Sequence, residues 1–545
     1  MLDPSIYKDS FAREHLPPEP LWPELPGNRP EFLYPKKLNA AVELLDSMID
    51  RGFGNRPCIR SPSGQVWSYE DLRNQANRLA ATLVNDCGLQ PGNRVLLRAV
   101  NSPMLAAAWF AVLKAGGIVV TTMPLLRSRE LAYIIAKARI GLAICDKALG
   151  EELEIARTQA QDLRTIAYFN TPDATGLEAR MASRADRFEN VIPSHDDVAL
   201  IAFTSGTTGK AKATVHFHRD VLTICDGYAR SVVKPQPEDI FSGTPPLAFT
   251  FGLGGLLLFP LRFGASTLLL ERATAASMLQ AIQDHRVTSL FTAPTMYRAM
   301  TGLANTFDLR SLKRCVSAGE HLPATVLENW RKATGITILD GIGSTEMLHI
   351  FVTARDGDAR PGSTGRPVDG YQALIVDEEM RPLPANTIGR LAVKGPTGCR
   401  YLDDDERQKD YVRNGWNLTG DAYRRDEDGY FWYQARTDDM IVSAGYNISG
   451  TEVESVMLDH PAIKELAVVG VADDSRGMIV KAFVVLKDPR AAGEVLAKEL
   501  QDFVKAQIAP YKYPRAIEFI DVLPRTETGK VQRFRLRERD KASRS

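Results

Sequence analysis

The sequence predicts a protein of mixed α/β and α+β class. We expect a large N-terminal domain of layered α/β subdomains with a small β subdomain, and then a small α+β C-terminal domain. From Tyr69 to about Leu339, helical and strand-like patterns alternate, which indicates parallel α/β layers. Past Gly362 the pattern changes to short strands and turns, and a compact tail begins at about Asp439.

The first α/β region is indicated by the spacing of its apolar residues. Over residues 69–86 these residues recur on one helical face, and the apolar run over 94–100 predicts a strand. A helix over 103–114, a strand over 117–123, a helix after Ser128 and a strand over 141–145 follow. In the second region, over 199–339, strands are predicted at ALIAFT, STLLL, SLFTA and CVSAG.

The remaining parts of the chain have different sequence patterns. The β subdomain is predicted from the strands YQALIVD, GRLAVKG and GYFWYQA. In the tail we expect helices over 451–458 and 493–507 and strands over 467–471 and 480–486. Residues 1–36 are rich in proline, and we expect them to form an extended arm over the surface.

Composition excludes several classes of protein. Lysine plus arginine equals aspartate plus glutamate at 67 each, so the chain has no excess positive charge that would favour binding to nucleic acid. Six scattered cysteines without a CxxC pair predict reduced thiols rather than a disulfide framework or a zinc site. The N-terminus lacks a secretory pattern, and the most apolar run, over 251–263, is too short to span a bilayer. We therefore expect a cytoplasmic protein with neither nucleic acid nor membrane as a partner.

The stretch TSGTTGKAK, from Thr204 to Lys212, has the composition of a phosphate-binding loop. A Walker A loop requires four residues between its glycines, whereas only two separate Gly206 and Gly209. The glycines also fail the spacing of a dinucleotide-binding fingerprint. What remains is a turn after a strand whose hydroxyls, glycines and lysines suit a polyphosphate.

Five motifs in order resemble the adenylate-forming ANL superfamily, which includes acyl-CoA synthetases, adenylation domains and luciferases. They are TSGTTGKAK, GIGSTEM at 341–347, TGD at 419–421, RTDDMIVSAGYNIS at 436–449 and PRTETGK at 524–530. The resemblance covers residues 38–535. It implies the ANL fold, with an AMP-binding domain over 1–437 and a mobile domain over 438–545 that turns about a hinge at Asp438.

The resemblance implies a reaction in two steps. A carboxylate attacks the α-phosphate of MgATP to give acyl-AMP and pyrophosphate, and the thiol of coenzyme A then displaces AMP. ATP, Mg²⁺ and coenzyme A are therefore the expected cofactors. Lys530 matches the family's catalytic lysine, Thr345 lies at the α-phosphate position, and Glu346 matches the Mg²⁺ ligand, for which a hard carboxylate oxygen is suited.

The same motifs imply the nucleotide and coenzyme A contacts. Asp421 resembles the carboxylate that binds the ribose hydroxyls, Arg436 a second ribose or phosphate contact, and Asp340 an acceptor for the adenine amine. Ile342 stands where many relatives have an aromatic residue, so we expect apolar contact there. The full expected set is Thr204, Ser205, Gly206, Thr207, Thr208, Gly209, Lys210, Lys212, Ala318, Gly319, Glu320, Asp340, Gly341, Ile342, Gly343, Asp421, Arg436, Gly445 and Tyr446.

The acid pocket is expected along PLAFTFGLGG, SAGE and GIGSTEMLHI. STEMLHIF resembles the corresponding segment of benzoate–CoA ligases, and the overall sequence pattern is similar to that of 2-aminobenzoate–CoA ligases. The hydroxyl of Thr250 stands where benzoate ligases tend to have a small apolar residue, so it suits an ortho amino or hydroxyl substituent. The expected substrate contacts are Phe249, Thr250, Phe251, Gly252, Ile342, Gly343 and His349.

These patterns predict an aryl-CoA ligase for benzoate or 2-aminobenzoate. A ligase for salicylate or another hydroxybenzoate, and a standalone enzyme that loads an aryl acid onto a carrier protein, remain alternatives. The sequence leaves monomer and homodimer open.

Overall fold

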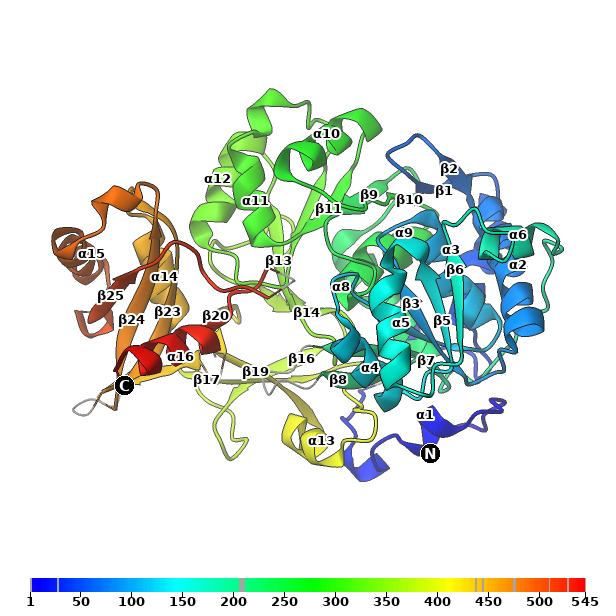
Figure 1. The fold of residues 1–545 in the computed structure, drawn as a ribbon. Helices are drawn as coiled ribbons and strands as arrows, with labels where there is room; N and C mark the ends of the chain where they lie inside the picture. Colours follow the sequence, from blue (N-terminus) through cyan, green and yellow to red (C-terminus); the bar gives the residue numbers. More distant parts are fainter. Residues whose placement is uncertain are drawn as a thin grey trace. The chain divides into compact units, whose positions relative to one another are not determined.

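The chain forms two compact units in a computed structural model. The structure describes residues 2–26, 29–204, 211–436, 439–443, 446–473, 477–508, 510–526 and 529–544. The first unit comprises Met1–Ala373 with Val393–Asn417, and the second comprises Leu374–Ala392 with Leu418–Ser545. The ribbon of each unit is drawn in Figure 1.

A six-stranded sheet in the order β6-β5-β3-β4-β7-β8 forms one layer of the first unit. Neighbouring strands are parallel except β7 and β8, which are antiparallel, and helices α3, α4 and α5 connect and cover the strands (Figure 1). The strands are β3 (Arg94–Arg98), β4 (Ile118–Thr122), β5 (Leu142–Asp146), β6 (Thr165–Phe169), β7 (Val198–Thr204) and β8 (Lys212–Phe217). The helices are α2 (Tyr69–Cys87), α3 (Pro103–Lys114), α4 (Ser128–Lys137), α5 (Gly150–Gln159) and α6 (Leu177–Ala182).

A nine-stranded sheet forms the other layer, in the order β15-β14-β13-β12-β11-β9-β10-β1-β2. The strands from β13 to β1 in this order are parallel, so their carboxyl ends meet at one edge. The strands are β1 (Pro57–Arg60), β2 (Val66–Ser68), β9 (Ile240–Gly243), β10 (Ser266–Leu268), β11 (Ser289–Thr292), β12 (Arg314–Ser317), β13 (Ile338–Gly343), β14 (Ile350–Thr353) and β15 (Arg366–Pro367). Helices α10 (Ala275–His285), α11 (Pro294–Thr301) and α12 (Ala324–Thr334) complete this layer, whereas α7 (His218–Ile224) packs on β7 and β8 of the six-stranded sheet.

The most apolar run of the sequence forms three consecutive helical segments inside the first unit. They are α8 (Thr250–Leu253), η7 (Gly254–Leu258) and α9 (Phe259–Arg262). Leu256, Leu257 and Phe259 are fully buried, as expected for core. Within the described residues, no helix combines the length and hydropathy needed to cross a bilayer.

The proline-rich arm is largely extended, but its described residues include three short helical segments and reach the core. The segments are α1 (Phe11–Glu14), η1 (Glu19–Leu21) and η2 (Pro30–Phe32). Phe11 and Ala12 are buried in the same apolar cluster as Leu96 and Val120 of the six-stranded sheet. The arm is therefore part of the packing of the first unit.

The second unit contains an antiparallel ribbon and the C-terminal α+β fold. The strands β16 (Gln372–Val376), β17 (Ile388–Lys394), β19 (Trp416–Arg425) and β20 (Phe431–Arg436) form the ribbon. Helix α13 (Asp405–Tyr411) and strand β18 (Val412–Arg413) belong to the first unit. A five-stranded sheet has the order β22-β21-β24-β23, with β25 beside β24. Its strands are β21 (Ile441–Ser443), β22 (Tyr446–Ile448), β23 (Ile463–Asp473), β24 (Gly477–Leu486) and β25 (Ala516–Phe519), and its helices are α14 (Gly450–Leu458), α15 (Glu494–Gln507) and α16 (Arg533–Arg544).

The predicted fold class is confirmed by this arrangement of sheets and helices. All six cysteines are free thiols, as expected. The hinge residue Asp438 lies outside the described residues, so the domain boundary at 437/438 remains a prediction.

Candidate active site

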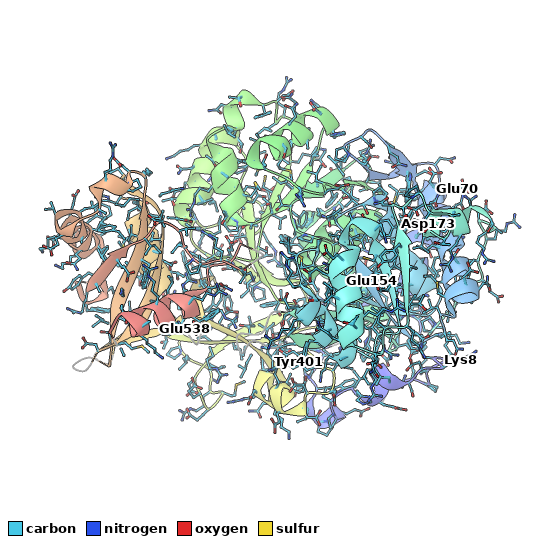
Figure 2. All side chains as sticks on the ribbon, viewed as in Figure 1. Lys8, Glu70, Glu154, Asp173, Tyr401 and Glu538 are labelled. Carbon is cyan, nitrogen blue, oxygen red and sulfur yellow. The ribbon has the colours of Figure 1, made fainter. Side chains whose placement is uncertain are left out.

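The turn between β13 and β14 brings several predicted site residues together. The two strands are antiparallel, and Gly343 pairs with Ile350, so residues 344–349 form the turn. Glu346 is buried, with 7% of its surface exposed, and its Oε1 accepts a hydrogen bond of 2.7 Å from the Tyr401 hydroxyl. Tyr401, labelled in Figure 2, also has the Lys212 ammonium 5.8 Å from its ring centroid. The predicted metal ligand and the end of the phosphate loop thus meet at Tyr401.

A second contact ties this turn to β8. The Nε2 of His216 donates to the Thr345 carbonyl over 2.8 Å. Burial lowers the pKa of His216 to about 4, so the ring is neutral at pH 7 and donates from one nitrogen only. Thr204 pairs with Lys212 at the ends of β7 and β8, and His216 of the same strand β8 contacts the turn at Thr345.

The chemistry of Glu346 suits a magnesium ion. It is a buried carboxylate, and within the described part of the chain its Oε2 has no hydrogen-bond or ion-pair partner. A carboxylate oxygen that is not engaged by the protein is a hard ligand of the kind that Mg²⁺ prefers. The hydrogen bond from Tyr401 would fix the orientation of the carboxylate, as outer partners of metal ligands usually do.

The carboxyl ends of β12 and β13 carry the predicted adenine contacts. Ser317 pairs with Asp340 across these strands, and Ala318, Gly319 and Glu320 follow directly. Gly319 has a φ of 89°, a left-handed conformation that glycine adopts without strain. Glu320 accepts a 2.7 Å hydrogen bond from the Thr295 hydroxyl. The strand ends therefore place these residues beside Asp340.

Asp340 is an unusual carboxyl group. It is 5% exposed, and within the described residues its Oδ1 has no hydrogen-bond partner. Burial raises its pKa to about 8, although the Ser317 hydroxyl and the Gly341 amide lower it in part. An unpaired acceptor at this strand end suits the amine expected there.

Replacing Asp340 with asparagine should stabilise the ligand-free protein, and more so at higher pH. The native Asp340 holds its proton up to about pH 8, whereas in the unfolded chain it releases it near pH 3.8. The unfolded state therefore binds fewer protons between these values, and the stability of the wild type falls as pH rises through this window. Melting temperatures of both proteins from pH 5 to 9 should diverge up to about pH 8 and then run parallel. A difference that is independent of pH would contradict the assignment.

An aromatic cluster surrounds His349 at the other end of the turn. The His349 ring centroid lies 4.6 Å from that of Phe259, 5.2 Å from Tyr228 and 5.8 Å from Phe251. Phe251 in turn lies 5.8 Å from Phe291. Burial lowers the pKa of His349 to about 3, so its ring is neutral. The predicted substrate residues Phe251 and His349 thus share one apolar wall.

The start of α8 supplies the other predicted pocket residues. Phe249 is the residue before the helix and is half-buried, while Thr250 is 9% exposed. A Cβ on Gly252 would lie 2.1 Å from the Pro246 carbonyl, so only glycine permits this close turn. Gly343 is similarly restricted, because a Cβ there would lie 2.7 Å from the His349 carbonyl.

Three predicted residues meet in the second unit. Asp421 and Arg436 pair across β19 and β20, and their side chains form a 3.0 Å ion pair. Burial raises the pKa of Asp421, while Arg436, Thr419 and the charge of Lys530 lower it in part. Lys530 is exposed at a turn in which its amide donates to the Thr526 hydroxyl over 3.1 Å. The structure therefore groups the predicted ribose carboxylate with the predicted catalytic lysine.

Some predicted positions are not described. Ser205, Gly206, Thr207, Thr208, Gly209, Lys210, Asp438 and Gly445 lie outside the described residues, and of Tyr446 only the backbone is described, in β22. Their predicted roles remain predictions.

Sequence reasoning missed two residues of the site. Tyr401 and His216 contact Glu346 and Thr345 from 55 and 129 positions away in the chain. Neither lies in one of the five motifs, because each belongs to a strand segment whose pairing only the fold reveals. The isolated bridge between Thr214 and Tyr401 is that pairing.

Comparisons with known proteins identify the family of the chain. The AMP-binding enzyme family matches residues 49–400, and the AMP-binding enzyme C-terminal domain matches residues 452–530. Benzoate–CoA ligase of Thauera aromatica is 35% identical over 519 residues, which is 93% of this chain and 97% of the relative.

Two solved structures are similar along nearly the whole chain. The anthranilate CoA ligase AuaEII in complex with anthranoyl-AMP has a TM-score of 0.87 at 34% identity, over 93% of this chain and 98% of that chain. A benzoate CoA ligase from Burkholderia xenovorans LB400 has a TM-score of 0.84 at 34% identity, over 92% of this chain and 100% of that chain.

The chain belongs to the AMP-binding enzyme family, and its predicted membership of the ANL superfamily is confirmed. It is an ATP-dependent acid–CoA ligase of the benzoate–CoA ligase type, with ATP and coenzyme A as substrates and Mg²⁺ as the family's usual cofactor.

Proposed function

We propose that this ligase activates 2-aminobenzoate or benzoate to the acyl adenylate and then transfers the acyl group to coenzyme A. The observation that carries this choice is the aromatic wall around His349, with Thr250 at the start of the neighbouring helix α8. A flat ring fits such a wall because aromatic contacts add to the apolar burial.

The polar groups of this wall favour an ortho substituent. Within the described residues the one polar partner of the His349 ring is the Phe251 backbone, so at least one of its two ring nitrogens is unpaired. Leaving a buried polar atom unpaired costs about 1–3 kcal/mol, so an amino or hydroxyl group that pairs with it recovers part of that cost. The hydroxyl of Thr250 offers a second partner of the same kind. We therefore rank 2-aminobenzoate with benzoate, salicylate next and long-chain fatty acids last.

The proposed roles of the site residues follow from charge. Adenylation brings a carboxylate to a polyphosphate, so cations and donors must be in place beforehand. Glu346 would hold Mg²⁺, which when bound would supply positive charge against the phosphates. Lys212 and the phosphate loop would hold the pyrophosphate end, and Asp421 the ribose. Lys530 would stabilise the charge that develops between the carboxylate and the α-phosphate.

The proposal is tested by pyrophosphate release across a panel of aryl acids, with and without coenzyme A. We expect the highest kcat/KM for 2-aminobenzoate or benzoate, and turnover beyond one equivalent only when coenzyme A is present. A preference for salicylate would move the assignment to the hydroxybenzoates. Equal turnover with a pantetheine-loaded carrier protein would favour the carrier-loading alternative.

Replacement of Thr250 with valine should change selectivity more than activity. Valine keeps the shape but removes the hydroxyl, and one hydrogen bond contributes about 0.5–1.5 kcal/mol. We expect kcat/KM for 2-aminobenzoate to fall about 3- to 10-fold, while the value for benzoate stays within about twofold. Competition between the two acids in one reaction measures this ratio directly. An equal loss for both acids would mean that Thr250 only packs.

A further inference from the structure

Residues of the proline-rich arm contact the segment that carries Tyr401. The indole ring of Trp22 lies 4.9 Å from the guanidinium carbon of Arg400, and the ring of Phe217 lies 4.3 Å from it. Arg400 directly precedes Tyr401 and is fully buried. The arm therefore packs on the residue next to the one that binds Glu346.

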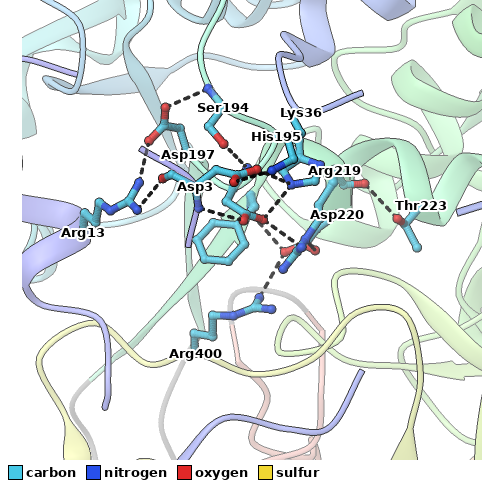
Figure 3. Close-up of polar contacts among 12 residues, drawn as sticks. Asp3, Arg13, Lys36, Ser194, His195, Asp197, Arg219, Asp220, Thr223 and Arg400 are labelled. Carbon is cyan, nitrogen blue, oxygen red and sulfur yellow. Dashed lines mark hydrogen bonds and ion pairs between the residues drawn. The ribbon is translucent and has the colours of Figure 1, made fainter. Parts of the chain in front are cut away.

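The charge of Arg400 is balanced inside the core. Its Nη1 donates to Asp220 over 3.1 Å, and both side chains are fully buried. Figure 3 shows this pair at one end of a network of polar contacts that continues through Arg219 to residues of the arm. Arg219 binds Asp196 at 2.7 Å, and His195 lies 3.5 Å from both Asp196 and Asp3 of the arm.

Backbone contacts hold the same segment from two sides. On one side, the amide of Val215 donates to the Arg400 carbonyl over 2.8 Å, which aligns the segment with β8. On the other side, Gln408 accepts from the amide of Tyr401 over 2.9 Å and donates to the carbonyl of Leu21 over 2.9 Å. Gln408 thus links the arm backbone directly to the Tyr401 backbone.

These contacts leave Tyr401 with little freedom. Its ring packs edge-on against Tyr411 with 5.7 Å between centroids, and its hydroxyl has the Glu346 carboxylate as acceptor. The orientation of one Glu346 oxygen is therefore set by a residue that the arm holds in place.

We propose that Tyr401 is a positioning residue for Glu346, and that the N-terminal arm sets its position through Trp22 and Gln408. The proposal rests on the role of Glu346 in the proposed function. It assigns to the arm a part in magnesium-nucleotide binding. If the arm served stability alone, its loss would change melting temperature without changing the dependence on magnesium.

The first test is Tyr401→Phe, with Tyr297→Phe as the matched control. Tyr297 is an equally buried tyrosine whose hydroxyl donates to the carbonyls of Leu290 and Val316, away from Glu346. Calorimetry measures ATP affinity with Mg²⁺ and with EDTA. We expect Tyr401→Phe to weaken MgATP binding about 10-fold or more and to leave binding in EDTA within about twofold. Tyr297→Phe should match the wild type in both.

Two half-reactions give a second readout of Tyr401→Phe. Adenylate formation should require a higher Mg²⁺ concentration for half-maximal rate, whereas conversion of supplied acyl-AMP and coenzyme A to thioester should be unchanged. Equal changes in both half-reactions, or a magnesium dependence equal to that of Tyr297→Phe, would overturn the proposal. The calorimetric measurement needs no aryl acid, so it tests the role of Tyr401 even if the proposed acid is wrong.

The second test addresses the arm. Trp22→Ala should weaken MgATP binding several-fold, and Trp22→Phe, which restores an aromatic ring over Arg400, should recover most of that loss. Leu33→Ala changes an arm residue that is 67% exposed and should have no effect. If Trp22→Ala lowers melting temperature while MgATP affinity stays at the wild-type value, the arm has no positioning role.

Discussion

Replacement of Lys530 with alanine is expected to slow adenylate formation by about 10²- to 10³-fold, because it removes a cation from the developing charge at the α-phosphate. Thioester formation from supplied acyl-AMP should stay within about threefold of the wild type. Pyrophosphate release and thioester formation, each measured separately, give the two rates. The split is expected because the lysine is proposed to act in one half-reaction only.

Lys487→Ala is the matched control for this experiment. Lys487 is an exposed lysine of the same compact unit, so its removal changes net charge equally. We expect both half-reactions of Lys487→Ala to match the wild type. If Lys530→Ala lost both half-reactions to the same extent, the separation of the two steps, and with it the proposed hinge at Asp438, would have to be abandoned.

Replacement of Glu346 with glutamine is expected to reduce adenylate formation by about 10²-fold or more. Glutamine keeps an oxygen that can accept the Tyr401 hydrogen bond, so the change removes chiefly the negative charge that a magnesium ion requires. The apparent affinity for Mg²⁺ should fall, and excess Mg²⁺ should restore part of the rate. A titration of pyrophosphate release against Mg²⁺ measures both effects.

The surface residue Glu328 offers a control of the same chemistry. Glu328→Gln lies on the exposed side of α12 and should leave the titration unchanged. An adenylation rate for Glu346→Gln equal to that of Glu328→Gln would exclude Glu346 as the metal ligand. Melting temperatures of both variants without nucleotide would separate this result from a folding defect.

Local signals predicted much of the fold. Helix α3 begins at Pro103 and ends at Lys114 as expected, since Ser102 caps its first turn and proline suits the first helical position. The strands of the tail are longer than expected: β23 covers Ile463–Asp473, because polar residues at its ends continue the pairing with β24. Apolar patterns locate the middle of a strand, whereas cross-strand pairing decides where it ends.

The candidate site was predictable only where its residues lie in one motif. Thr345, Glu346 and His349 share a short turn, so the sequence groups them. Tyr401 reaches Glu346 from another strand segment, and Trp22 reaches Arg400 from an arm with no catalytic motif. Such contacts depend on tertiary packing, which spacing along the chain does not encode.

The turn over 344–349 has a consequence for the redesign of acid specificity. It carries the carboxylate of Glu346 at one side and the imidazole of His349 three residues later, with buried Leu348 between them in a left-handed conformation at φ 69°. A residue with a side chain is strained there, so the turn has few alternative shapes. A larger or smaller side chain at His349 would therefore disturb nucleotide activation together with acid choice. Helix α8 contributes Phe251 to the same wall and carries no proposed metal ligand, so we expect it to be the better place to alter which acid the enzyme accepts.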